Sequence, residues 1–129
     1  MNIAILKGNV GQEPKIKTFK EGGKIAEFSL ATTERGFTTR DGHEIKPRTD
    51  WHSIVVRQSG LAGIVEKYVH KGTPVLVQGK ICYRTYEDNS GQTRYVTEIV
   101  AEDIELLSSG EKKSDYKPAD DYPDEDNYR

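Results

Sequence analysis

Residues 49–57 read TDWHSIVVR, and the chain continues through SGLAGIVEKYVHKG at 59–72, PVLVQGKICYRTY at 74–86 and RYVTEIVAEDIELL at 94–107. Side chains alternate along the first segment, so Ile54 and Val56 point one way and Trp51 points the other. The second segment has apolar residues at spacings of three and four, which predicts a short helix with Ser59 at its cap and Tyr68 in its buried stripe. The last two segments flank a polar turn and predict a long β-hairpin.

Two further strands are expected before this stretch. Alternation at residues 2–10 predicts the first, and Ala26, Phe28 and Leu30 fall on one face of the second. Residues 34–48 are rich in glycine and charge and show no sustained period, so they predict a long surface loop. Five strands with the only helix between the third and the fourth have the order of an OB-fold. The sequence therefore predicts an all-β protein built on a five-stranded Greek-key barrel.

Length and charge divide the chain into two parts. We expect residues 1–107 to form one domain with a modest core. Residues 109–129 hold 4 Lys and Arg against 7 Asp and Glu, a net charge of -3, whereas residues 1–108 hold 15 against 14, a net charge of +1. The segment 108–129 has no branched aliphatic residue, so we expect a disordered acidic tail. The domain can still bind a polyanion if its cations share one face.

The cysteine content and the hydropathy of the chain indicate the cellular compartment of the protein. The single cysteine, Cys82, has no partner for an intrachain disulfide, and the N-terminal residues do not resemble a secretory signal. No apolar run approaches the roughly 20 residues of a membrane-spanning helix. These features predict a cytoplasmic protein without a membrane partner.

Aromatic and cationic side chains gather on sheet positions and in the long loop. A protein that binds single-stranded nucleic acid needs aromatic rings on which bases stack, interleaved with cations that meet phosphates. On the third strand, Trp51 and Arg57 share the face opposite the aliphatic residues, and Arg84, Tyr86, Arg94 and Tyr95 extend that surface along the hairpin. The loop adds Arg35, Phe37, Arg40, Lys46 and Arg48, and Lys7 offers a further phosphate contact.

The same residues argue against catalysis. Asp50, His52 and Ser53 alternate across a strand, so they cannot converge as an acid, a base and a nucleophile. The three histidines and the one cysteine lack the spacing of metal ligands. We therefore expect no enzyme activity, no catalytic residue, no metal and no cofactor. For Trp51 alone, packing at the rim of a core is the competing interpretation.

Several motifs, taken in order, resemble the bacterial single-stranded DNA-binding protein family over residues 1–107. They are GNVG at 8–11 with Pro14, FSLAT at 28–32, TDWH at 49–52, YVHKG at 68–72 and SGQTRY at 90–95. The resemblance implies an OB-fold that assembles as a homotetramer and binds single-stranded DNA without sequence preference. It also implies stacking roles for Trp51, Tyr86 and Phe37. Arg57 departs from the family pattern, since better-known members place a phenylalanine there.

The tail departs from the family as well. Its acidic run ends DEDNYR at 124–129 without the usual apolar tip, so recruitment of replication and repair proteins through Tyr122, Pro123 or Tyr128 is a hypothesis. The function expected is that of a nucleoid-associated protein that coats single-stranded DNA during replication, recombination and repair. The alternatives are an OB-fold protein-interaction module of a replication complex with incidental DNA contact and, third, an oligosaccharide-binding module.

Overall fold

Eight strands and one helix make up residues 1–107, the part of the chain that the computed structural model describes. The elements are β1 (Ala4–Val10), β2 (Lys15–Thr18), β3 (Lys24–Glu34), β4 (Phe37–Thr38), β5 (Glu44–Ile45), β6 (Arg48–Val56), α1 (Ser59–Tyr68), β7 (Pro74–Glu87) and β8 (Thr93–Leu106). The expected tail at 108–129, with Tyr122, Pro123 and Tyr128, lies outside the described residues. Within the described part, no helix is long and apolar enough to cross a membrane.

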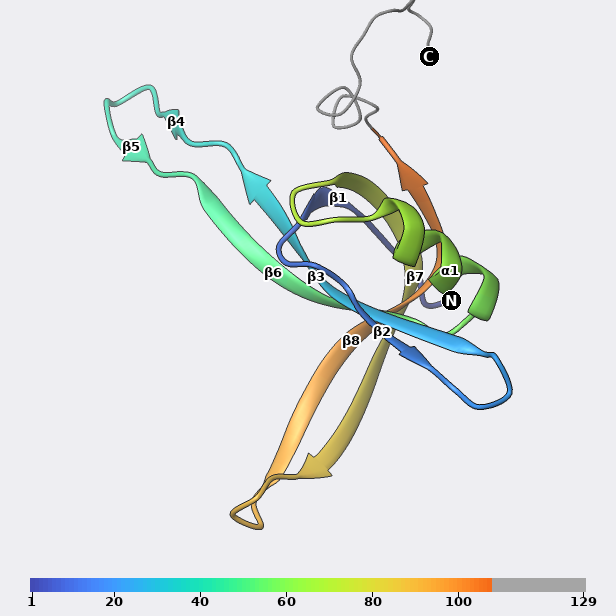
Figure 1. The fold of residues 1–129 in the computed structure, drawn as a ribbon. Helices are drawn as coiled ribbons and strands as arrows, with labels where there is room; N and C mark the ends of the chain where they lie inside the picture. The colour runs from blue at the N-terminus through green and yellow to red at the C-terminus, as the bar shows by residue number, and fades with distance from the viewer. Residues whose placement is uncertain (108–129) are drawn as a thin grey trace, which may run out of the picture.

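Five of the strands close into a barrel (Figure 1). Their spatial order is β1-β7-β8-β6-β3, and a short pairing of β1 with β3 at Asn9↔Ala31 and Val10↔Leu30 completes the ring. The pair β6 and β8 is parallel, whereas the other pairs are antiparallel. The helix α1 falls between the third and fourth barrel strands in chain order. This arrangement confirms the predicted all-β Greek-key barrel of OB type.

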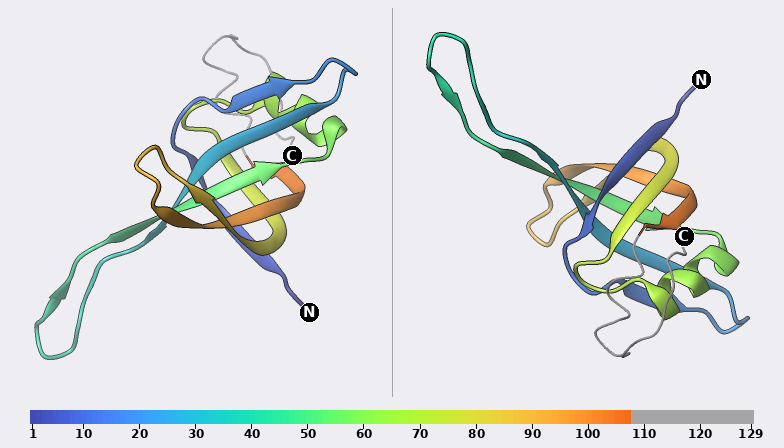
Figure 2. Two further views of the ribbon diagram at one scale, coloured as in Figure 1. Left: turned by 90° about the horizontal axis from the view of Figure 1, so that it is seen from below. Right: turned by 90° about the horizontal axis from the view of Figure 1, so that it is seen from above.

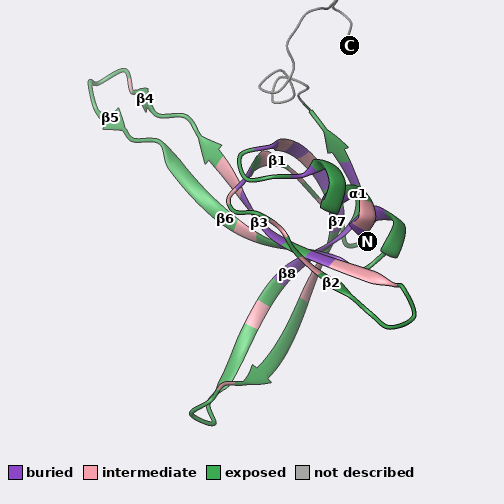
Figure 3. Cartoon of the chain, viewed as in Figure 1, coloured by how far each residue is buried: buried purple, intermediate pink, exposed green. Residues whose placement is uncertain are grey.

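The core fills the barrel with aliphatic side chains from alternate strand positions. Figure 3 shows buried residues concentrated where the strands converge and exposed residues along the projecting hairpins. The largest fully buried side chains are Leu30, Ile54, Val56, Val65, Val69, Val75 and Val77. Ile54 and Val56 therefore face inward as predicted, and Trp51, three positions before Ile54, faces outward with 63% of its surface exposed.

Hairpins extend the strands beyond the barrel. Figure 2 shows the β4–β5 hairpin and its flanking chain projecting far from the barrel, and the β7–β8 hairpin projecting in another direction. The sequence predicted a long loop at 34–48 and no strand there, which is wrong: β4 and β5 pair at Phe37↔Ile45 and Thr38↔Glu44. Two-residue strands are too short to show a period. Gly42, at a φ of 89°, supplies the left-handed residue that their turn requires.

Two predictions for the helix are corrected. The N-cap is Gln58, and the Ser59 hydroxyl instead accepts a hydrogen bond from the Lys24 backbone N–H at 3.1 Å. Tyr68 was predicted to lie in the core, but 56% of its surface is exposed. The helix buries only a narrow stripe of Leu61, Ala62 and Val65, so the predicted apolar face is wider than the one that packs on the barrel.

Candidate nucleic-acid interface

Strand register defines one continuous surface on the outside of the barrel. Directly paired residues share a face of a sheet, and the pairs Ala31↔Trp51, Val55↔Val100 and Lys80↔Val100 carry one face across β3, β6, β8 and β7. Because side chains alternate along each strand, the same face carries Ser53 and Trp51 on β6. It also carries Glu98 and Arg94 on β8, and Arg84 and Tyr86 on β7. We call this surface the outer face. It joins Trp51 to Tyr86 without crossing the core.

A groove borders Trp51 on the outer face. Its volume is about 340 Å³, and it is lined by residues of β2, β3 and β6 and of the segment between β1 and β2, including Gln12, Glu13, Lys15, Ser29, Trp51 and Ser53. This volume is at the small end of the roughly 300–1,000 Å³ typical of small-ligand sites. The lining of the groove therefore combines an exposed indole with one lysine and with the carboxylates of Glu13 and Glu27.

Gly11 lets the indole lie against the barrel. A Cβ atom added at residue 11 would stand 2.4 Å from Cζ3 of Trp51 and 2.7 Å from Oγ of Ser29. No side chain fits in that space, so the ring covers the glycine backbone. The Gly11 N–H donates to the Ser29 carbonyl oxygen at 2.9 Å, which fixes the glycine beneath the ring.

Glu13 fastens the segment that carries Gly11 to the loop after α1. Its carboxylate accepts a hydrogen bond from the Lys71 backbone N–H at 2.9 Å and another from Nδ1 of His70 at 3.1 Å. The Lys71 N–H, and then the His70 side chain, lower the pKa of Glu13. The floor beneath Trp51 is thus held by contacts between distant parts of the chain.

Tyr86 and Arg84 form a second aromatic and cationic pair on the outer face. The guanidinium carbon of Arg84 lies 5.9 Å from the centroid of the Tyr86 ring, within the range of a cation–π contact. Nη2 of Arg84 also donates to Oε2 of Glu98 at 3.1 Å. That hydrogen bond and the charge of Glu98, followed by the charge of Glu27, raise the pKa of Arg84.

Arg94 and Tyr95, predicted to extend one surface together, lie on opposite faces of the hairpin. Arg94 pairs with Tyr86 and lies on the outer face, whereas Tyr95 pairs with Thr85 and shares the other face with Tyr83. Tyr95 is 82% exposed there. The structure therefore separates Tyr95 from the Trp51 and Tyr86 rings, because neighbouring residues of a strand alternate.

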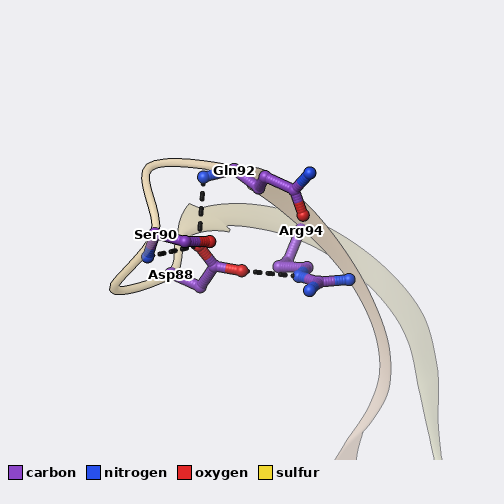
Figure 4. A network of polar contacts seen from close by, with 4 residues as sticks. All are labelled: Asp88, Ser90, Gln92 and Arg94. Carbon is purple, nitrogen blue, oxygen red and sulfur yellow. Dashed lines mark hydrogen bonds and ion pairs between the residues drawn. The ribbon is translucent and has the colours of Figure 1, made fainter.

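Arg94 is tied into the hairpin turn (Figure 4). Its Nε donates to Oδ2 of Asp88 at 2.8 Å, and Oδ1 of Asp88 accepts from the backbone N–H groups of Ser90 and Gln92, each at 3.0 Å. These hydrogen bonds, the one from Arg94 first, lower the pKa of Asp88 to about 2. Arg94 therefore belongs to a turn network as well as to the outer face.

The remaining predicted residues differ in their ion pairs. Arg48 meets Asp50 at 3.2 Å, whereas Lys7, Arg35 and Arg57 have no ion pair within residues 1–107. Phe37 is exposed on the β4–β5 hairpin beside its partner Ile45, and Arg35, Arg40 and Lys46 are exposed along the same projection. This projection extends away from the barrel (Figure 1).

Sequence reasoning overlooked two cations on β2. Lys15 pairs with Glu27 and Lys17 pairs with Ile25, so both lie on the outer face. Lys15 also lines the groove beside Trp51. The signal was present in the alternation of Lys15, the partly buried Ile16 and Lys17. A four-residue strand with two lysines is easily taken for a polar connector.

An OB-type barrel that carries aromatic rings and cations on one outer face is typical of one class of protein. The proteins of this class bind nucleic-acid strands on that face. Comparison with known proteins gives the family. The model of the single-strand binding protein family matches residues 1–107, and the chain belongs to that family. This membership agrees with the expectation of a non-enzymatic protein.

Proteins similar to this chain are named as single-stranded DNA-binding proteins. The chain is 51% identical over 108 residues to a single-stranded DNA-binding protein of Bacteroides thetaiotaomicron, covering 84% of this chain and 66% of that protein. It is 47% identical over 104 residues to the protein of that name from Rickettsia typhi, covering 81% and 68%. A solved structure described as "Plasmodium falciparum SSB complex with ssDNA" superposes with a TM-score of 0.75 at 39% identity, covering 84% of this chain and 96% of that one. The matched region thus spans about two thirds of the bacterial relatives' length.

Proposed function

We propose that this protein coats single-stranded DNA without sequence preference and protects it during replication, recombination and repair. The observation that carries the proposal is the exposed indole of Trp51 beside a groove that Lys15 also lines, on the outer face of an OB-type barrel. Family membership and the similarity to a chain solved with single-stranded DNA support it. Residues 1–107 are the proposed DNA-binding domain.

The proposed contacts combine stacking and charge. Bases stack on Trp51 and Tyr86, and each stacked base contributes about 1–3 kcal/mol. Phosphates meet the cations that lack an ion pair within the described residues, above all Arg57, with Lys7 on β1 and Arg35 between β3 and β4. Lys15 and Lys17 add to this set. Neither contact reads a base edge, which accounts for binding without sequence preference.

Titration of Trp51 fluorescence with polythymidine tests the proposal. Trp51 is the only tryptophan of the chain, so its emission reports one site. We expect strong quenching that added salt reverses, since each phosphate contact releases counterions. An emission that polythymidine leaves unchanged contradicts the proposal and favours the protein-interaction module. A panel of oligosaccharides is the control, and it should leave the emission unchanged.

The proposed assembly is a homotetramer. Ile3 and Ile5 are exposed at the start of the chain, with Ile5 on the outside of β1. Exposed aliphatic residues gathered on one wall are typical of a protein interface. Sedimentation velocity with and without polythymidine tests the assembly, and a mass of one chain in both conditions contradicts it.

The proposal extends to location and partners. A DNA-coating role places the protein in the cytoplasm, at the nucleoid, and the segment 108–129 is the proposed contact for replication and repair proteins through Tyr122, Pro123 or Tyr128. Recovery of such proteins on the full chain, compared with a chain ending at residue 108, tests the partner role. Equal recovery by both chains contradicts it.

A further inference from the structure

Glu98 is an unusual residue for the outer face of a barrel. Only 4% of its surface is exposed, and among residues 1–107 it is the sole buried residue with an ionisable side chain. A carboxylate removed from water is strongly destabilising unless a cation and hydrogen bonds compensate it. The buried Glu98 carboxylate therefore needs a cation that remains in contact with it.

Arg84 is that partner. Its Nη2 lies 3.1 Å from Oε2 of Glu98, while half of the Arg84 side chain remains exposed. The charge of Glu27 adds to that of Glu98 in raising the pKa of Arg84. The positive charge of Arg84 is thus already compensated by Glu98 before any phosphate arrives.

The same guanidinium contacts the Tyr86 ring. The distance from its central carbon to the ring centroid is 5.9 Å. Tyr86 lies two residues after Arg84 on β7, and its ring is half exposed. The Arg84 side chain thus contacts both the buried carboxylate and the ring on which a base would stack.

We propose that Glu98 is a positioning residue for the DNA interface: it neutralises Arg84 and holds it against Tyr86, so that Arg84 supports base stacking and makes no phosphate contact. This inference rests on the proposed function. It assigns different roles to two of the candidate arginines. Arg57, which has no ion pair within the described residues, meets phosphate, whereas Arg84 orders the aromatic surface.

The salt dependence of polythymidine binding tests the inference, because it counts neutralised phosphates. The logarithm of the binding constant falls against the logarithm of salt concentration with a slope of about -0.7 for each phosphate contact on single strands. Four proteins are compared as full chains: the native protein, Glu98→Gln, the double variant Glu98→Gln with Arg84→Gln, and Arg57→Gln as the control. The double variant removes both charges together, so it leaves no uncompensated buried carboxylate. Circular dichroism verifies the fold of each.

We expect Glu98→Gln to steepen the slope by about 0.7, because Arg84 becomes available to one phosphate. The double variant should return to the native slope, and Arg57→Gln should flatten it by about 0.7. A double variant with a slope flatter than the native one by that amount overturns the inference, since Arg84 would then already contact a phosphate. A native slope in Glu98→Gln also overturns it. A native protein that fails to bind polythymidine refutes the proposed function instead.

Discussion

Replacing Gly11 by alanine should displace the Trp51 indole without disturbing the barrel. The added Cβ would stand 2.4 Å from Cζ3 and 3.1 Å from Cη2 of that ring, whereas carbon atoms in contact prefer about 3.5–4.0 Å. The ring must therefore move by about 1 Å or more. Residue 11 does not have a left-handed backbone, so alanine adds no strain of its own there.

The size of the effect follows from the lost stacking contact. One base stacked on an aromatic ring contributes about 1–3 kcal/mol, which corresponds to about a 5- to 150-fold change in affinity. We expect Gly11→Ala to weaken polythymidine binding within this range and to reduce the quenching of Trp51 at saturation. Both quantities come from one fluorescence titration.

Gly63→Ala is the matched control for this experiment. Residue 63 lies in α1, and an added Cβ meets nothing within 4 Å. Alanine in a helix should stabilise the protein by roughly 0.5–1 kcal/mol and leave DNA binding unchanged. Native affinity and native quenching in Gly11→Ala would refute the idea that the glycine positions the ring.

Three other predictions address the barrel, the turn and the tail. Gly8→Ala should lower the free energy of unfolding in urea by about 1–3 kcal/mol, because its Cβ would stand 2.0 Å from the Ala31 carbonyl oxygen where the barrel closes; an unchanged midpoint would contradict this. The pKa of Asp88 is about 2, against an ordinary value of 3.8. The ionised Asp88 carboxylate therefore stabilises the turn fully above pH 3.8, and this stabilisation is lost as the pH falls through 2. A titration of the Asp88 carboxyl by NMR with a midpoint near 3.8 would disprove it. Deleting residues 109–129 removes a net charge of -3 that competes with phosphate, so affinity should rise, most at low salt; equal affinities at low salt would rule this out.

The barrel could be predicted from sequence because its longer strands alternate clearly. The alternation that separates Ile54 and Val56 from Trp51 is enough to show which face of β6 points into the core. The polar turn between two long apolar stretches predicts the β7–β8 hairpin. The short elements could not be predicted in this way. In β2 two of four residues are lysines, and β4 and β5 have two residues each, so none of them shows a hydrophobic period.

The sequence names the candidate residues of the site, and the structure shows how they lie relative to one another. Alternation alone could have separated Arg94 from Tyr95, since adjacent strand residues face opposite sides. The ion pairs could not be foreseen, because Arg84 meets Glu98 only through the register of β7 and β8. Gly11 likewise reaches Trp51 through the way the chain folds over β3 and β6.

The most direct test of the outer face is the affinity of Trp51→Ala combined with Tyr86→Ala for a fluorescently labelled polythymidine oligonucleotide, measured by anisotropy. Two lost stacking contacts of about 1–3 kcal/mol each predict a decrease of at least about 25-fold relative to the native chain. Circular dichroism should show an intact fold, because both rings lie outside the core. A native affinity in the double variant would show that single-stranded DNA binds elsewhere on the protein or not at all.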